Sequence, residues 1–133
     1  MSQENVEIVR RGYAGFLNTG TFVRENFASD FVWDMSHYDG WPEQQVYEGV
    51  EAAQRFMQEW TSAWVDWDLQ IDKLLDVGDK VVAVVRQRGR SKLTGIPVEV
   101  SFAKVWTLRG GKNTRMDMYS DPHEALKAAG LEE

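Results

Sequence analysis

The first twenty residues place apolar side chains three or four positions apart, which is the spacing of one helix face. The residues on this stripe are Val6, Val9, Tyr13, Phe16 and Leu17. Turn-forming residues at 18–20 end the helix, and residues 21–26 predict a short second helix that begins at Thr21. The chain therefore opens with two helices of unequal length.

At residues 30–36 the spacing of the large apolar side chains changes to two. Phe31, Trp33 and Met35 share one phase of this alternation, which predicts a strand with all three on the same face. Residues 37–46 contain glycine, proline and two adjacent glutamines, a composition typical of a loop.

Helical spacing returns over residues 48–65, which predict the longest helix. Its apolar stripe consists of Val50, Ala53, Met57, Trp60 and Trp64. Charged and amide side chains fill the opposite positions, so this helix is expected to bury one side and expose the other.

The rest of the chain predicts four strands and a final helix. The strands cover residues 67–77, 80–90, 98–108 and 112–120. Gly110-Gly111 is typical of a two-residue hairpin turn between the last two of them. The sequence Asp121-Pro122-His123-Glu124 combines an N-cap acid with Pro at the first helical position, so a short helix follows and ends at Gly130.

Runs of helices and runs of strands, without strict alternation, predict an α+β protein. We find no repeat or linker, so residues 1–133 are expected to form a single domain. A long, mostly antiparallel sheet must curve around its helices, and this curvature leaves a tapering hollow between the two layers.

Six short segments carry a resemblance to a known family. They are residues 7–13, 27–30, 47–50, 77–82, 102–109 and 119–121. In this order and spacing, the chain resembles the SnoaL-like branch of the nuclear transport factor 2-like (NTF2-like) superfamily over essentially its full length. The resemblance implies a cone-shaped fold whose strongly curved sheet encloses a pocket, and a homodimer formed through the open sheet face. It does not fix the chemistry, since that fold hosts isomerases, cyclases, dehydratases, epoxide hydrolases and plain binding modules.

Composition narrows the choice of partners. The chain has no cysteine, and 15 Lys and Arg against 21 Asp and Glu give a net charge of −6. This charge argues against nucleic acid and anionic membranes as partners. No apolar run is long enough to span a bilayer and no signal peptide is apparent, so we expect a cytoplasmic protein. No metal or cofactor is expected, because the two histidines lie far apart and no nucleotide motif occurs.

The candidate catalytic residues are Asp34, His37 and Asp117. By resemblance, Tyr13 and Asp34 match part of a ketosteroid-isomerase site, but Ala103 stands near the position of its second acid. His37 lies beside the expected mouth of the hollow, where a histidine would serve as a general acid or base near neutral pH.

The arginines form a second candidate group. Arg86, Arg88 and Arg90 alternate, so their side chains are expected on one sheet face. Arg86 or Arg88 would bind a carboxylate, enolate or phosphate of a ligand; the alternative is a solvated stripe whose ion pairs cross the strands, with Glu99 opposite Arg90. The epoxide-hydrolase pattern needs an acid where Arg88 stands, and it places its second aspartate one residue away from Asp117.

The six tryptophans are the remaining signal. The ligand-binding candidates among the aromatic residues are Tyr13, Phe16, Trp33, Trp60, Trp64, Trp106 and Tyr119. Together they would line a pocket for a flat, hydrophobic molecule. Three functions remain open: an acid–base isomerase or cyclase acting on a cyclic ketone or polyketide-like substrate, a protein that binds a hydrophobic ligand unchanged, and a dimerisation module.

Overall fold

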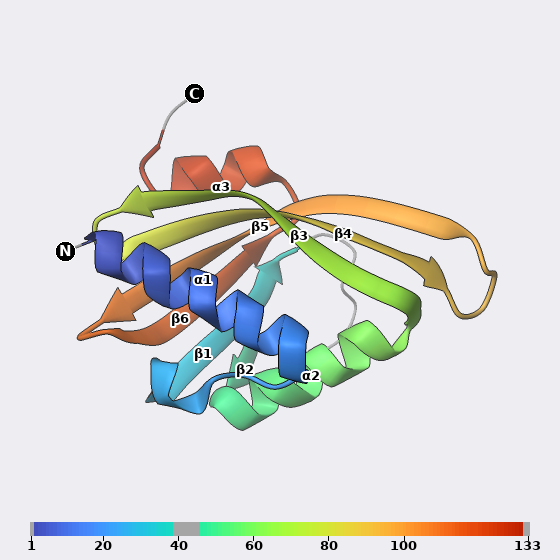
Figure 1. The fold of residues 1–133 in the computed structure, drawn as a ribbon. Helices are drawn as coiled ribbons and strands as arrows, with labels where there is room; N and C mark the ends of the chain where they lie inside the picture. The colour runs from blue at the N-terminus through green and yellow to red at the C-terminus, as the bar shows by residue number, and fades with distance from the viewer. Residues whose placement is uncertain (1, 39–45, 132–133) are drawn as a thin grey trace.

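The computed structural model describes residues 2–38 and 46–131 (Figure 1). The elements in chain order are α1 (Ser2–Thr19), η1 (Arg24–Asn26), β1 (Phe27–His37), β2 (Val46–Glu48), α2 (Val50–Ser62), β3 (Trp64–Val77), β4 (Lys80–Ser91), β5 (Pro97–Arg109), β6 (Lys112–Tyr119) and α3 (Pro122–Ala128). None of the described helices is both long enough and apolar enough to cross a membrane.

The strands form one six-stranded sheet in the order β2-β1-β6-β5-β4-β3. Neighbouring strands are antiparallel except for β1 and β6, which run parallel. Helices α1 and α2 lie against one face, which we call the inner face, and α3 lies on the opposite, outer face (Figure 1). The chain is therefore an α+β protein with a mostly antiparallel sheet, as the sequence predicted.

Alternation along the strands divides the core into two parts. The larger part lies on the inner face and includes Phe31, Trp33, Met35, Val85, Phe102, Trp106, Met116 and Met118. The smaller part lies under α3, where Val82, Ala103 and Val105 pack against Ala125. Asp121 caps α3 as predicted, since its side chain accepts a hydrogen bond from the backbone N–H of His123.

The predicted boundaries of the long helix are wrong at both ends, because α2 covers only Val50–Ser62. At the end of α2, the Thr61 hydroxyl donates a hydrogen bond to the carbonyl of Met57, and the Ser62 hydroxyl donates one to the carbonyl of Glu59. Trp64 consequently begins β3 instead of continuing the helix stripe.

Two other predictions need correction near the N-terminal half. The expected second helix is only the three-residue turn η1, and β1 begins earlier than predicted, at Phe27. Strand β2 pairs with β1 where the sequence suggested the end of a loop. The rest of that predicted loop, residues 39–45, lies outside the described residues.

A bulge near the end of β1 decides where His37 lies. Asp34 pairs with Asp117 and His37 pairs with Tyr119, so β1 advances by one residue more than β6 between these pairs. The extra residue shifts His37 to the face that carries Asp34 and Tyr119.

Candidate functional site

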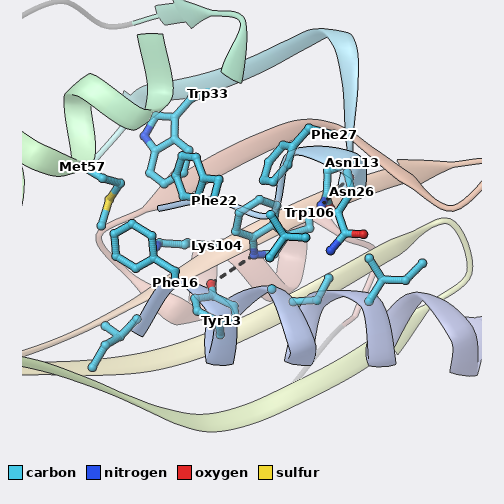
Figure 2. Close-up of a pocket in the computed structure, with 15 residues that line it drawn as sticks. Tyr13, Phe16, Phe22, Asn26, Phe27, Trp33, Met57, Lys104, Trp106 and Asn113 are labelled. Carbon is cyan, nitrogen blue, oxygen red and sulfur yellow. Dashed lines mark hydrogen bonds between the residues drawn. The ribbon is translucent and has the colours of Figure 1, made fainter. Parts of the chain in front are cut away.

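A small cavity lies between α1, the segment around η1, α2 and the inner face of the sheet (Figure 2). Its volume is about 30 Å³, which is room for a water molecule but not for an aromatic ring. Its wall includes Tyr13, Phe16, Phe22, Phe27, Trp33, Met57, Leu69, Lys104, Trp106 and Asn113. The wall is predominantly apolar, so its few polar groups identify what the cavity can recognise.

Lys104 is the most unusual group on this wall. It occupies the inward phase of β5 between Phe102 and Trp106, and only 3% of it is exposed. Its Nζ lies 5.1 Å from the centre of the Trp33 ring and 5.3 Å from that of Tyr13. No hydrogen bond or ion pair of this nitrogen occurs among the described residues. Aromatic faces favour a cation. Burial acts in the opposite direction and lowers the pKa of Lys104 to about 7.

Tyr13 brings a second polar group from α1 into the same cavity. Trp106 Nε1 donates a hydrogen bond to the Tyr13 hydroxyl oxygen at 3.1 Å. Burial raises the pKa of Tyr13 far above its usual value, against a smaller lowering by Trp106. The phenol therefore stays protonated and keeps its own O–H proton to donate.

Two further polar atoms on wall residues lack partners in the described part of the chain. Trp33 Nε1 and Asn113 Oδ1 are buried there without a hydrogen bond. The Asn113 amide nitrogen is satisfied, since it donates to the carbonyl of Asn26 at 3.1 Å. Because native interiors pair most buried polar groups, such atoms indicate a place where a bound molecule or water completes the bonding.

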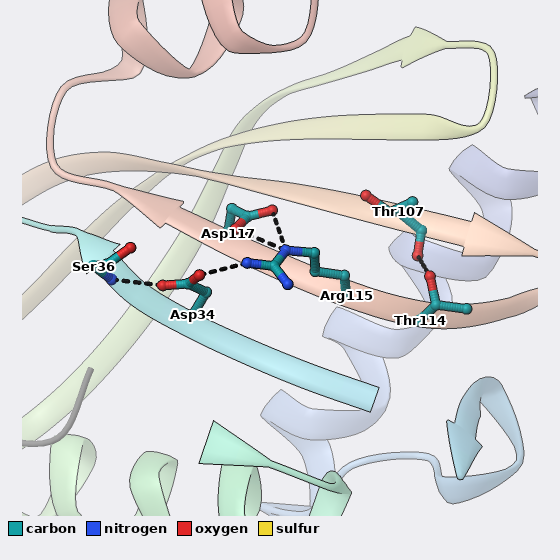
Figure 3. A network of polar contacts seen from close by, with 6 residues as sticks. All are labelled: Asp34, Ser36, Thr107, Thr114, Arg115 and Asp117. Carbon is teal, nitrogen blue, oxygen red and sulfur yellow. Dashed lines mark hydrogen bonds and ion pairs between the residues drawn. The ribbon is translucent and has the colours of Figure 1, made fainter. Parts of the chain in front are cut away.

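The cavity wall holds no carboxylate and no histidine among the described residues. Asp34, His37, Asp117 and Tyr119 are brought together, but on the outer face. Arg115 joins Asp34 and Asp117 there (Figure 3). We call these five residues the outer polar group. Arg115 bonds to both Asp34 and Asp117, and His37 stacks on Tyr119 with ring centres 4.5 Å apart.

The two acids of the outer polar group respond differently to their surroundings. Burial alone would raise the pKa of Asp34, but hydrogen bonds from Ser36 and the guanidinium of Arg115 together lower it. Burial raises the pKa of Asp117, and Arg115 offsets only part of that effect. Asp34 is therefore an ionised, paired carboxylate at neutral pH.

Arg86 and Arg88 also lie on the outer face. Arg86 pairs with Asp72 at 2.8 Å and reaches Glu99 at 3.5 Å, while Arg88 lies 4.0 Å from Glu99. The strands are shifted by two residues relative to the expected pairing, since Glu99 faces Arg88 instead of Arg90. Gln87, between the two arginines, is the residue that points inward.

Neither Trp60 nor Trp64 is among the residues that line the cavity. Trp60 and Trp67 both donate to the Gln87 side-chain oxygen. Trp64 lies against Gly89, where an added Cβ would meet its side chain at 3.4 Å. Of the predicted ligand-binding residues, Tyr13, Phe16, Trp33 and Trp106 therefore share the cavity.

Sequence reasoning missed Lys104, Phe22 and Asn113. A signal for Lys104 was present, because it is the only charged residue in the otherwise apolar phase of 98–108. Phe22 and Asn113 carry no such signal, since their roles depend on how η1 and β6 approach each other. In the described part of the chain, no three acidic or histidine side chains cluster closely enough to hold a metal ion.

Comparison with known proteins places the chain in a family. The model of the SnoaL-like domain matches residues 9–116, so the chain belongs to the SnoaL-like family. A search among curated proteins gives no match.

Solved structures share the fold of the whole chain. An NTF2-like protein from Burkholderia xenovorans LB400 is 25% identical, with a TM-score of 0.73 and 97% of each chain covered. A candidate SnoaL-like polyketide cyclase from Jannaschia sp. CCS1 is 21% identical, with a TM-score of 0.74, covering 98% of this chain and 94% of that one. TerC, co-crystallised with polyporic acid, is 21% identical, with a TM-score of 0.73, covering 96% and 98%.

Proposed function

We propose that this chain binds a flat, hydrophobic small molecule in the cavity beneath α1, with an acidic or carbonyl oxygen of the ligand directed to Lys104. The observation that carries the proposal is the buried amine of Lys104, which lacks a partner among the described residues and faces an aromatic wall. A structural neighbour, TerC, was co-crystallised with an organic acid, polyporic acid, which supports a ligand of this kind.

The ligand must displace side chains in order to enter. A cavity of about 30 Å³ is smaller than one benzene ring requires. Phe16 and Phe22 are both half-buried, and their ring centres lie 5.3 Å apart. We assign the opening motion to these two rings because both are half-buried and pack against each other on the cavity wall.

Calorimetric titration with naphthoic acid and with naphthalene tests this function. The wild-type chain is expected to bind the acid more tightly than the hydrocarbon, because a carboxylate pairs with the Lys104 ammonium. Lys104→Met should weaken binding of the acid at least tenfold and leave naphthalene unchanged. Lys92→Met, which alters an exposed lysine, serves as the matched control. Equal affinity of both variants for the acid would refute the assignment.

Acid–base chemistry on a cyclic ketone remains a second proposal. Its support is that Lys104, with a pKa near 7, and the protonated hydroxyl of Tyr13 share one cavity. Lys104 would remove a proton next to the carbonyl, and Tyr13 would donate to the enolate oxygen. Exchange of the α-protons of indanone in deuterated water should disappear in Lys104→Met and persist in Asp34→Asn. Loss of exchange in Asp34→Asn would contradict this proposal and would identify Asp34, in the outer polar group, as the general base.

A homodimer through the sheet face is a separate proposal that rests on the family resemblance. Between β3 and β5 the outer face carries ion pairs, and α3 covers Val82, Ala103 and Val105. Any such interface would therefore be largely polar in that region. Native mass spectrometry at micromolar concentration measures the oligomeric state directly, and a monomer at every concentration would rule the dimer out.

A further inference from the structure

Lys104 differs from every other lysine that the structure describes. Its amine lies in the core, whereas Lys92, Lys112 and Lys127 lie at the surface. The nearest described groups are the ring faces of Trp33, Tyr13 and Phe102, at 5.1, 5.3 and 5.9 Å from Nζ to the ring centres. Aromatic contact satisfies a cation only in part, and it leaves the nitrogen lone pair of the neutral amine unused.

The described wall of the cavity has no acidic group that would keep this amine protonated. Tyr13 is the only other titratable residue on the described wall, and it is neutral. No carboxylate faces Lys104 from α1, α2, β1 or β6 within the described residues. The acids of the outer polar group lie on the other side of the sheet. A substantial fraction of the amine is therefore neutral near pH 7, since burial lowers its pKa to about 7.

We propose that Lys104 forms a reversible imine with flat aldehydes or ketones that enter the cavity, so that the site captures carbonyl compounds covalently. This inference rests on the proposed binding function and specifies the class of ligand. A buried, desolvated lysine amine is the usual nucleophile for this reaction in proteins.

The reaction balances with groups already present. The Lys104 nitrogen attacks the carbonyl carbon, so that a C–N bond forms, the C=O π bond breaks, and one amine proton moves to the oxygen to give a carbinolamine. The C–O bond then breaks as the second nitrogen proton is transferred to the hydroxyl group, so that the oxygen leaves as water and a neutral C=N bond forms. No oxidant or reductant is consumed. Tyr13 is placed to donate a hydrogen bond to the carbonyl oxygen, because its hydroxyl and the Lys104 side chain extend into the cavity from α1 and β5 (Figure 2).

Chain composition favours a clean test. The protein has no cysteine, so no thiol competes for an aldehyde. Benzaldehyde is a suitable probe because it is flat, small and without a second reactive site. The wild-type protein would be incubated with benzaldehyde and sodium cyanoborohydride at pH 7, which reduces any imine to a stable secondary amine.

Peptide mapping by mass spectrometry then locates the product. The labelled peptide gains the mass of benzaldehyde less one oxygen atom. Labelling at Lys104 is expected to exceed labelling at Lys92 at least tenfold, since an ordinary lysine has on the order of one neutral amine in a thousand at this pH. Lys104→Met should abolish this site of labelling, and Lys92→Met should leave it unchanged.

The possible outcomes separate this inference from the proposed function. Labelling confined to surface lysines, together with selective binding of naphthoic acid, overturns the imine and leaves the binding function in place. If Lys104 is not labelled and naphthoic acid does not bind selectively, both the imine and the proposed binding function are overturned. If Lys104→Met does not fold, the distribution of label within the wild-type protein decides the question alone.

Discussion

The two faces of the sheet treat buried charge in opposite ways. On the outer face, Asp34 is 6% exposed and receives hydrogen bonds from Ser36 and Arg115. On the inner face, Lys104 is equally enclosed, but no described group pairs with it. A paired buried charge mainly contributes to structure, whereas an unpaired one costs stability and is expected where a ligand completes it.

This contrast changes which residues are the candidates for chemistry. Asp34, His37 and Asp117 are the residue types that acid–base catalysis uses, yet they surround a guanidinium outside the cavity. The cavity instead offers one amine and one phenol. Substitutions on the two faces test this difference, and the largest effect is expected at Lys104.

Replacing Lys104 should stabilise the protein. In the wild type, a folded-state pKa of about 7 against 10.5 in the unfolded chain means that the unfolded state holds an extra proton between these values. The free energy of unfolding therefore rises with pH across this interval, and the full cost of the buried charge applies below pH 7. Lys104→Met is expected to raise the free energy of unfolding by on the order of 3 kcal/mol at pH 6.

Urea denaturation of wild type and Lys104→Met from pH 6 to 8.5 measures this effect. The free energy of unfolding gained by Lys104→Met should decrease as pH rises. The reason is that the Lys104 amine of the folded wild type loses its proton, and a neutral amine costs less to bury. Lys92→Met should show no such trend. A gain that stays constant over the whole range would mean that Lys104 stays protonated in the folded protein throughout, as it would beside an acidic partner.

Enlarging the cavity by shortening Phe22 should lower the stability of the protein and raise its affinity for the ligand. Phe22 packs against Phe16, Phe27 and Trp33, with ring centres between 5.3 and 5.8 Å apart. Phe22→Ala is expected to lower the free energy of unfolding by about 2 kcal/mol, less than for a fully buried ring. It should also tighten binding of naphthoic acid several-fold, since the ligand no longer has to displace the ring. Calorimetry on Phe22→Leu provides the intermediate case, and unchanged affinity in both variants would place the ligand elsewhere.

Local patterns in the sequence predicted the inner face well. The alternation of Phe31, Trp33 and Met35 and the helix stripe that includes Tyr13 place these side chains in the core without further information. Each depends only on the period of its own element, which the order of residues determines. The cap at Asp121 is equally local.

Features that depend on the pairing of distant strands were not predictable in this way. The bulge that turns His37 outward exists only in the register between β1 and β6. The shift that pairs Arg88 with Glu99 depends on the geometry of the 91–97 turn. Trp64 fits a helix stripe as well as a strand, and neighbouring strand contacts decided the outcome. Lys104 was visible as a charged residue in an apolar phase, but its isolation follows from what every other element places nearby.

Breaking the outer polar group should cost stability without affecting the cavity. Arg115→Met leaves Asp34 and Asp117 close together without their shared guanidinium. We expect the free energy of unfolding to fall by about 1–2 kcal/mol at pH 7, because one hydrogen bond from Ser36 still satisfies Asp34. Binding of naphthoic acid should be unchanged. A loss of binding in Arg115→Met would show that the two faces are coupled, so that the outer polar group contributes to the cavity.

The smallest effect is expected at Arg88, which tests the alternative anchor for an anionic ligand. Its side chain is more than half exposed and its contact with Glu99 is 4.0 Å long. Exposed pairs of this kind contribute little, so Arg88→Ala should change the free energy of unfolding by less than about 0.5 kcal/mol. Titration with naphthoic acid should give the wild-type affinity, because the sheet separates Arg88 from the cavity. If Arg88→Ala weakened binding of the acid as much as Lys104→Met does, the ligand would lie on the outer face, and the unpaired amine of Lys104 would need a different explanation.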